Sequence, residues 1–295
     1  MDSDKKVRYV QYLVNSAAIG DIDSVKSFIE DDDIDVNSID DDGYTALYQA
    51  AGGGHYSIVE YLLSKGANVN FKIESDDPAL CGSTPLCYAA MNGHVDVAKT
   101  LIQHGASTDV VVNGYNLLRT AAMSDNPSMI EFALGFGASI DDCSPNGRTP
   151  LIFAVGENNY ESVAFLLEKG ADYKKFTDKG MSALTLSVLG QGPESYRVTE
   201  LLLKHVEAKE GKDGLVEYMN SVDPIEGRTA LHSACFMNNY HAVKLLLEKG
   251  ADYKKKDKKG SRPSALVFGD SHLCRQIRWL FGPYAEADLA RSHER

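Results

Sequence analysis

Long apolar runs are missing from this chain of 295 residues. The first residues, MDSDKKVRYVQYL, lack the apolar core of a secretion signal, and no later run reaches the roughly 20 apolar residues that span a membrane. Cysteine is sparse as well, with five residues scattered at positions 81, 87, 143, 235 and 274 and no C-x-x-C pair. That spacing indicates neither a disulfide framework nor a zinc site. We therefore expect a protein of a reducing compartment, the cytoplasm, that neither enters nor crosses a membrane.

Positive charge is also in short supply, because 30 Lys and Arg stand against 42 Asp and Glu, a net charge of -12. This balance argues against broad affinity for nucleic acids or anionic membranes. The charge is uneven: residues 1–42 hold 12 acidic and 4 basic residues, whereas residues 250–262 hold 6 basic and 2 acidic ones. We expect a solenoid that is acidic at one end and basic at the other.

The acidic run from Asp31 invites comparison with a calcium-binding loop. Val36 stands where such a loop has its turn glycine, and Asp42 where it has a bidentate Glu. The mismatch favours a solvated loop, so we expect no metal and no cofactor.

Catalytic motifs are absent too: the chain contains no G-x-x-x-x-G-K-[ST], G-x-S-x-G or H-E-x-x-H. Two Cys/His pairs remain, Cys87 with His94 and Cys235 with His232, and either pair could supply a nucleophile and its base. The pair with Cys87 has no evident Asp or Asn to orient the histidine. We expect a non-enzyme and keep a Cys/His enzyme as an alternative.

The stretch Gly43–Asn70, GYTALYQAAGGGHYSIVEYLLSKGANVN, is the clearest pattern present. Ala46, Leu47 and the small pair that follows at 50 and 51 recur at helical spacing after Thr45, which can cap a helix. A second apolar face begins near Tyr56 and ends before Gly66, a residue suited to a helix stop. The stretch predicts two short antiparallel helices that cannot bury their apolar faces alone.

Copies of this stretch recur along the chain, each marked by a glycine, with intervals of 39, 32, 33, 33, 47 and 33 residues. The marker glycines are Gly43, Gly82, Gly114, Gly147, Gly180, Gly227 and Gly260. The two long intervals contain insertions, near residues 73–80 and 204–225, and the second is expected to extend a helix or to add a short one. Insertions in repeat arrays map to loops on one face, which is often the binding face.

The pattern T-A-L-x-x-A-A-x-x-G-H-x-x-x-V-x-x-L-L-x-x-G-A-x-V-N resembles the ankyrin repeat. The resemblance implies an all-α solenoid of antiparallel helix pairs with protruding hairpin loops. It predicts a single domain, 1–295, with caps at 1–42 and 260–295 and repeats at 43–81, 82–113, 114–146, 147–179, 180–226 and 227–259. In the last cap we align Ile277, Trp279 and Leu280 with V-x-x-L-L, so Trp279 is expected to fill the core.

The resemblance also implies a protein-protein interaction scaffold that binds a protein partner on its concave face, through hairpin tips and the ends of first helices. We expect a monomer with no small-molecule substrate. The corresponding positions are rich in aromatic residues, Met and Arg, which are enriched at interfaces. They are Tyr44, Met91, Asn92, Tyr115, Met123, Arg148, Glu157, Met181, Arg228, Phe236 and Met237.

The family uses histidine at the positions of His55, His94 and His232 to hold loops together. It also includes substrates of an asparaginyl hydroxylase, whose pattern Asn70 fits and Asn37 matches less well. A free-standing array of this kind resembles the effectors that intracellular bacteria deliver into host cytoplasm. A reader of nucleic acid or histone tails remains a further alternative, although the groove's arginines and tyrosines offer it thin support.

Overall fold

The chain folds as helices throughout residues 3–74, 82–109 and 116–284, the ranges that the computed structural model describes. These ranges contain fifteen α-helices and one 3-10 helix, η1. Two isolated antiparallel β-bridges, Ile39 with Thr45 and Phe176 with Ser182, are the only strand-like pairings among the described residues. The all-α prediction is confirmed. The chain divides into two compact units, Met1–Ser144 and Pro145–Arg295, and the prediction of one continuous domain stays a prediction.

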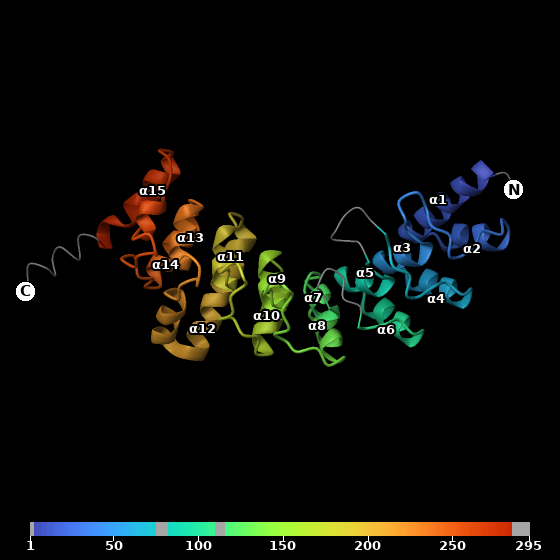
Figure 1. The fold of residues 1–295 in the computed structure, drawn as a ribbon, viewed down its shortest axis with the longest axis horizontal. Coiled ribbons are helices and arrows are strands. Elements are labelled where there is room, and N and C mark those ends of the chain that lie inside the picture. The colour runs from blue at the N-terminus through green and yellow to red at the C-terminus, as the bar shows by residue number, and fades with distance from the viewer. Residues whose placement is uncertain (1–2, 75–81, 110–115, 285–295) are drawn as a thin grey trace, which may run out of the picture. The chain divides into compact units, whose positions relative to one another are not determined.

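In the first unit, short helices alternate between two rows (Figure 1). α1, α3, α5 and α7 pack in that order in one row, and α2, α4, α6 and α8 pack in the other. Their bounds are α1 Ser3–Ile19, α2 Ile22–Glu30, α3 Ala46–Gly52, α4 Tyr56–Ser64, α5 Pro85–Met91, α6 Val95–Gln103, α7 Leu117–Ala121 and α8 Pro127–Leu134.

The second unit repeats the arrangement. α9, α11, α13 and η1 form one row, and α10, α12, α14 and α15 form the other. Their bounds are α9 Pro150–Gly156, α10 Tyr160–Glu168, α11 Ala183–Leu189, α12 Pro193–Met219, α13 Ala230–Phe236, α14 Tyr240–Glu248, η1 Pro263–Leu266 and α15 His272–Leu280.

The pair α3–α4 shows why each copy folds as it does. The Thr45 hydroxyl accepts a hydrogen bond from the amide of Tyr48 at 3.2 Å, and this bond satisfies one of the free N–H groups at the start of α3. After α4, Gly66 takes a φ of 85°, the left-handed conformation that closes the helix. The small side chains on α3 let α5 approach closely. The predicted apolar faces of both helices are buried, and they consist of Ala46, Leu47, Ala50, Ala51, Ile58, Val59, Leu62 and Leu63.

At the start of four of the second helices, one side chain ties the copy to the preceding one. His55 Nε2 lies 2.9 Å from the carbonyl oxygen of Ala18, and His94 Nε2 lies 2.9 Å from that of Gly52. Asn126 and Asn239 donate from their amides to the preceding copy in the same way. The structural role expected of His55 and His94 is therefore confirmed.

The hairpin loops are held by buried aspartates. Asp223 accepts backbone hydrogen bonds from Ile225, Glu226 and Arg228 at 2.6–2.9 Å. Gly227 closes the loop with a φ of 69°, and a Cβ there would lie 3.1 Å from Cγ of Lys258 in the next loop. Successive hairpin tips of the second unit thus stack closely on one another.

The second insertion forms the C-terminal part of α12, whose 27 residues comprise two helical segments that meet at Gly211, so the added short helix is the expectation that the structure supports. Gly211, with φ 73° and ψ -173°, departs from helical geometry, so α12 is kinked at this residue and is not a straight rod. Beyond the kink, Leu215, Tyr218 and Met219 are buried against the unit. The first insertion largely falls on residues 75–81, outside the described ranges.

The predicted core position of Trp279 is wrong, because 73% of its surface is exposed. α15 buries Ile277 and the following Phe281, and Leu280 is half-buried. The V-x-x-L-L pattern therefore falls on residues 277, 280 and 281, and Trp279 points away from the buried face because it lies two helical positions from Ile277. The correct register ends on Phe281, one residue later than predicted.

Candidate protein interface

Three of the predicted interface residues meet in the second unit. Met181, Arg228 and Phe236 line one pocket of about 250 Å³. Its walls are α11 and α13, and its rim consists of the hairpin tips at 179–181 and 223–228. The residues come from two successive copies whose marker glycines stand 47 residues apart, and the packing of α11 on α13 brings them together.

Arg228 is held rigidly at the edge of this pocket. Its guanidinium pairs with Glu226 at 2.6 Å and with the buried carboxylate of Asp257 at 3.6 Å, and it lies over the ring of Phe236 at 5.7 Å from the centroid. Only 21% of the side chain is exposed. The arginine is thus fixed before any partner arrives, and its charge is compensated within the protein.

Apolar side chains in the pocket and beside it are partly exposed to solvent. Phe236 is 48% exposed and meets Phe268 edge to face at 5.9 Å, and Phe268 is 56% exposed. Ile225, on the hairpin tip, is 51% exposed. We call Ile225, Phe236 and Phe268 the apolar patch. Such groups remain exposed at a cost unless something covers them, and aromatic rings beside an arginine are typical of interface centres.

Sequence reasoning missed Ile225 and Phe268. The sequence did contain a signal for Ile225, which lies two residues before its marker glycine. In the neighbouring copies this position holds the charged residues Asp178 and Lys258. An apolar residue at a hairpin tip is therefore unusual in this unit. Phe268 lies in the degenerate last copy, where the register was lost.

The remaining predicted residues of the second unit lie outside the pocket lining. Arg148 stacks over the ring of Phe153 at 5.8 Å. Glu157 is exposed at the end of α9. Met237 is half-buried, and its carbonyl accepts a hydrogen bond from the Gln191 amide at 2.8 Å.

In the first unit, the predicted residues are more widely spread. Tyr44 is half-buried and stacks on Tyr48 at 5.6 Å, and Tyr48 stacks in turn on Tyr88 at 4.6 Å. Asn92 is exposed and donates from its amide to the Tyr88 carbonyl at 3.0 Å. Met91 and Met123 are half-buried, and Tyr115 lies outside the described residues.

Asn70 bridges its own loop and the next one. Its amide nitrogen donates to the carbonyl oxygen of Gly105 at 3.0 Å, and its amide oxygen accepts from the backbone of Ser107 at 2.8 Å. Asn37 bonds in the same way to Gly66 and Asn68. Both asparagines are exposed, so the positions expected to be modified also contribute to the contact between copies.

Burial and hydrogen bonding constrain the residues of the two Cys/His pairs. Cys87 and Cys235 are buried, and burial raises the pKa of the Cys235 thiol, which disfavours the thiolate. The ring nitrogens of His232 are engaged with Thr229 and with the carbonyl of Ser261 at 3.1 Å. Among the residues that the structure describes, no group of three or more His, Cys, Asp or Glu side chains could hold a metal ion.

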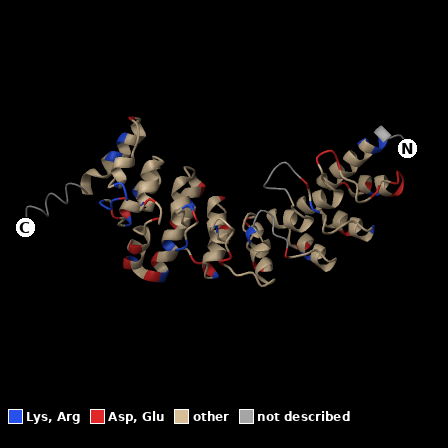
Figure 2. Cartoon of the chain, in the orientation of Figure 1, with Lys and Arg blue, Asp and Glu red and all other residues tan. Residues whose placement is uncertain are grey.

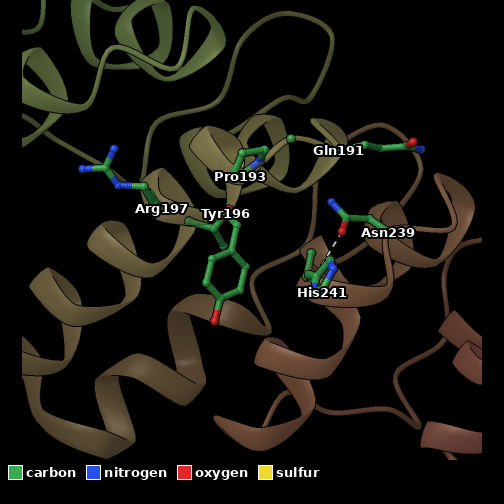
Figure 3. A pocket seen from close by; sticks show the side chains of 9 residues that line it. Gln191, Pro193, Tyr196, Arg197, Asn239 and His241 are labelled. Atoms are coloured by element: carbon green, nitrogen blue, oxygen red, sulfur yellow. Dashed lines mark hydrogen bonds between the residues drawn. The ribbon is translucent and has the colours of Figure 1, made fainter.

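A second cavity, of about 350 Å³, lies between the start of α12 and the start of α14 (Figure 3). Tyr196 and His241 line it in an edge-to-face contact at 6.2 Å. Arg197 points away from His241, pairing with Glu194 at 2.8 Å and lying over Tyr160 at 4.7 Å. Gln191 and Asn239, which also line the cavity, donate hydrogen bonds to backbone carbonyls, and the sequence indicated no function for the cavity.

Comparison with known proteins agrees with the fold. The family described as "Ankyrin repeats (3 copies)" matches residues 13–112, 71–142, 107–177 and 174–257. The human ASB11 ankyrin repeat domain, a crystal structure, is 22% identical, with a TM-score of 0.51 over 91% of this chain and 96% of that one. Within the described residues, no helix combines the length and the apolar character needed to cross a membrane.

Curated relatives come from several kinds of organism. Palmitoyltransferase AKR1 of Lachancea kluyveri is 36% identical over 168 residues, 55% of this chain and 22% of that protein. L-asparaginase of Dirofilaria immitis is 29% identical over 178 residues, 60% of this chain and 29% of that protein. The putative ankyrin repeat protein FPV034 of fowlpox virus is 33% identical over 129 residues, which are 44% of this chain and 29% of that protein. The chain spans less than a third of the length of these relatives.

Proposed function

Because the chain belongs to the ankyrin-repeat family, we propose that it is a non-enzymatic scaffold that binds a partner protein through the pocket between α11 and α13 and the adjoining apolar patch. The observation that carries the proposal is that Met181, Arg228 and Phe236 line one pocket. Ankyrin repeats stack into extended interaction surfaces while the repeated positions supply stability. Met181, Arg228 and Phe236 are not among those repeated core positions.

The chemistry of the surface supports binding. An arginine stacked on an exposed aromatic ring, beside further exposed apolar side chains, matches the residue types that carry most of the energy at protein interfaces. The network of Arg228, Glu226 and Asp257 holds the site in one arrangement, so binding loses little entropy in ordering it.

The predicted positions of the first unit extend this proposal. Tyr44, Met91, Asn92 and Met123 would form a second contact region on the side of the first helices, whereas Tyr115, predicted with them, lies outside the described residues. We also retain the cytoplasm as the proposed location, and host cytoplasm if the protein is an effector. Support comes from the free thiol of Cys143, which is exposed and would be prone to oxidation elsewhere.

Hydroxylation of Asn70 remains a proposal that rests on the family pattern. The side chain is exposed, but both ends of its amide bond to the next loop. Mass spectrometry after incubation with the hydroxylase would show an added oxygen at Asn70, and Asn37 serves as the weaker site for comparison. An unmodified Asn70 would end the idea.

A paired substitution tests the binding surface. The double variant Ile225→Ser with Phe236→Ser removes two members of the apolar patch, and the control Phe136→Ser alters an aromatic residue in the first unit that is 44% exposed. Proteins captured from cells by the full chain and by each variant are compared by quantitative mass spectrometry. Loss of two central contacts should reduce recovery of at least one partner by about 30-fold, the effect of roughly 2 kcal/mol at an interface.

The control should recover that partner at the level of the unaltered protein. Circular dichroism and thermal melting establish that each variant is folded. If the folded double variant captures the same proteins in the same amounts as the unaltered chain, this surface is not the binding site.

A further inference from the structure

The hairpin segments of the second unit carry positive charge in an otherwise acidic protein. Segments 172–181, 220–228 and 250–262 together contain ten Lys or Arg and six Asp or Glu, whereas the whole chain has a net charge of -12. Figure 2 shows basic residues in the loop that follows α14 and acidic residues in the loops of the first unit. The contrast is a local property of the surface around the apolar patch.

Lysines surround the hairpin tip that carries Ile225. Lys179 lines the pocket itself. Lys258 donates from Nζ to the carbonyl oxygen of Pro224 at 2.6 Å, and Lys259 Nζ lies 3.9 Å from Glu226. Lys179, Lys258 and Lys259 are exposed, and we call them the lysine rim. An apolar centre is thus bordered by ammonium groups that reach solvent.

Three of the carboxylates nearby are engaged within the protein, whereas Asp178, beside Lys179, is exposed. Asp223 accepts three backbone hydrogen bonds, and Asp257 accepts two from the backbone of its own loop. Glu226 pairs with Arg228 at 2.6 Å. Among the described residues, no carboxylate oxygen lies within 4.0 Å of the Lys179 ammonium group. The rim therefore offers more positive than negative charge to an incoming molecule, because its three lysines are exposed while Asp223, Asp257 and Glu226 are already bonded.

We propose that the partner bound here is an acidic protein segment that places an apolar side chain in the pocket and carboxylates against the lysine rim. This inference rests on the proposed function and adds the chemistry of the partner. Charge complementarity of this kind speeds association and excludes basic partners, because like charges across an interface repel.

Peptide libraries test the preference directly. Three immobilised octapeptide libraries share a central Leu-Phe pair and differ in the flanking positions, which hold Glu and Asp, Lys and Arg, or Ser and Gln. The full chain is passed over each. Retention on the acidic library should exceed retention on the basic one by about tenfold or more, and should fall as salt rises, because the screening length is only about 8 Å at physiological ionic strength.

A charge-matched pair of variants locates the preference. Lys179→Glu with Lys259→Glu reverses two rim charges, and Lys204→Glu with Lys212→Glu makes the same change of net charge on exposed positions of α12, in the other row of helices. The rim variant should lose about tenfold of its retention on the acidic library, and the α12 variant should lose little, since distant surface charges are screened.

The outcomes separate the inference from the function it rests on. Equal retention on all libraries, a preference for the basic library, or equal loss in both variants would overturn the acidic partner. If the Ile225 and Phe236 double variant loses its captured protein while the rim variant keeps it, the binding surface stands and its acidic specificity fails. If the Ile225 and Phe236 double variant is retained on the acidic library as well as the unaltered chain, the apolar side chain of the partner does not bind in this pocket.

A second copy of the chain is the other source of an acidic segment, because residues 31–42 contain seven acidic residues around exposed Ile39. Sedimentation velocity distinguishes binding of a second copy from binding of a separate partner. We expect a monomer at concentrations that support peptide binding. Self-association that the rim substitutions abolish would replace the separate partner with a second copy and overturn the proposal.

Discussion

Asn239 links α11 to the following helix pair through its side chain. Its amide nitrogen donates to the carbonyl oxygens of Val188 at 2.9 Å and Gly190 at 2.6 Å, and its amide oxygen accepts from the Ala242 backbone at 3.1 Å. Asn239→Ala removes all three bonds. Each bridging bond contributes about 0.5–1.5 kcal/mol and the helix cap about 1 kcal/mol, so the free energy of unfolding should fall by about 2–4 kcal/mol.

Asn239→His provides the matched control, because His55 and His94 make the bridging contact at the equivalent positions without capping their helices. The histidine should recover the bridge and lose the cap, for a cost of about 1 kcal/mol. Urea unfolding followed by far-UV circular dichroism measures both variants.

Two results would contradict this reasoning. If Asn239→Ala unfolds within about 0.5 kcal/mol of the unaltered protein, a range normal for surface changes, the bridge contributes little. If the histidine variant is as unstable as the alanine variant, the equivalence of the two side chains at this position fails.

Two further predictions concern the thiols and the kinked helix. Iodoacetamide should label the exposed Cys143 readily and leave Cys235 unlabelled in the folded protein, because burial of Cys235 raises the pKa of its thiol. Peptide mass spectrometry measures the labelling of each thiol. Equal labelling rates for the two thiols would reopen the Cys/His alternative. Glu210→Gln should destabilise the protein at neutral pH, since Lys174 and Tyr173 lower the pKa of Glu210 below its ordinary value of 4.5. Because the pKa of Glu210 is lower in the folded state than in the unfolded state, its carboxylate stabilises the fold at pH values above the unfolded-state pKa, and this stabilisation is lost as the pH falls through the folded-state pKa. The difference in unfolding free energy between the variant and the unaltered protein should therefore vanish in acid. A difference that persists in acid would show that the carboxylate charge is not its source.

Much of the fold could be predicted because its determinants are local. Thr45, Gly66 and the apolar spacing between them act within a few residues of one another, and the structure places a cap, a helix stop and two buried faces there. The same holds for His55, whose role follows from its position in the copy. Where the copy decays, the local signal weakens, and the register of α15 was missed by one residue around Trp279.

The candidate site was predicted in part. Position within the copy indicated Met181, Arg228 and Phe236 separately, but their meeting in one pocket depends on how α11 packs against α13. Ile225 and Phe268 escaped prediction because whether an apolar side chain is buried depends on neighbours distant in the sequence. The predicted residues of the first unit are more widely spread, and one of them, Tyr44, stacks on the ring of Tyr48.

The repeated helix pair, its family and the uneven distribution of charge could be predicted from the amino-acid sequence, because helix caps, turn glycines and apolar spacing act over a few residues. Only the tertiary structure decided that Trp279 faces solvent, that Arg228 is held by carboxylates from two hairpins, and that exposed Phe236 meets exposed Phe268. Those contacts join residues from different copies, and the packing of one copy on the next sets which side chains touch and which remain exposed.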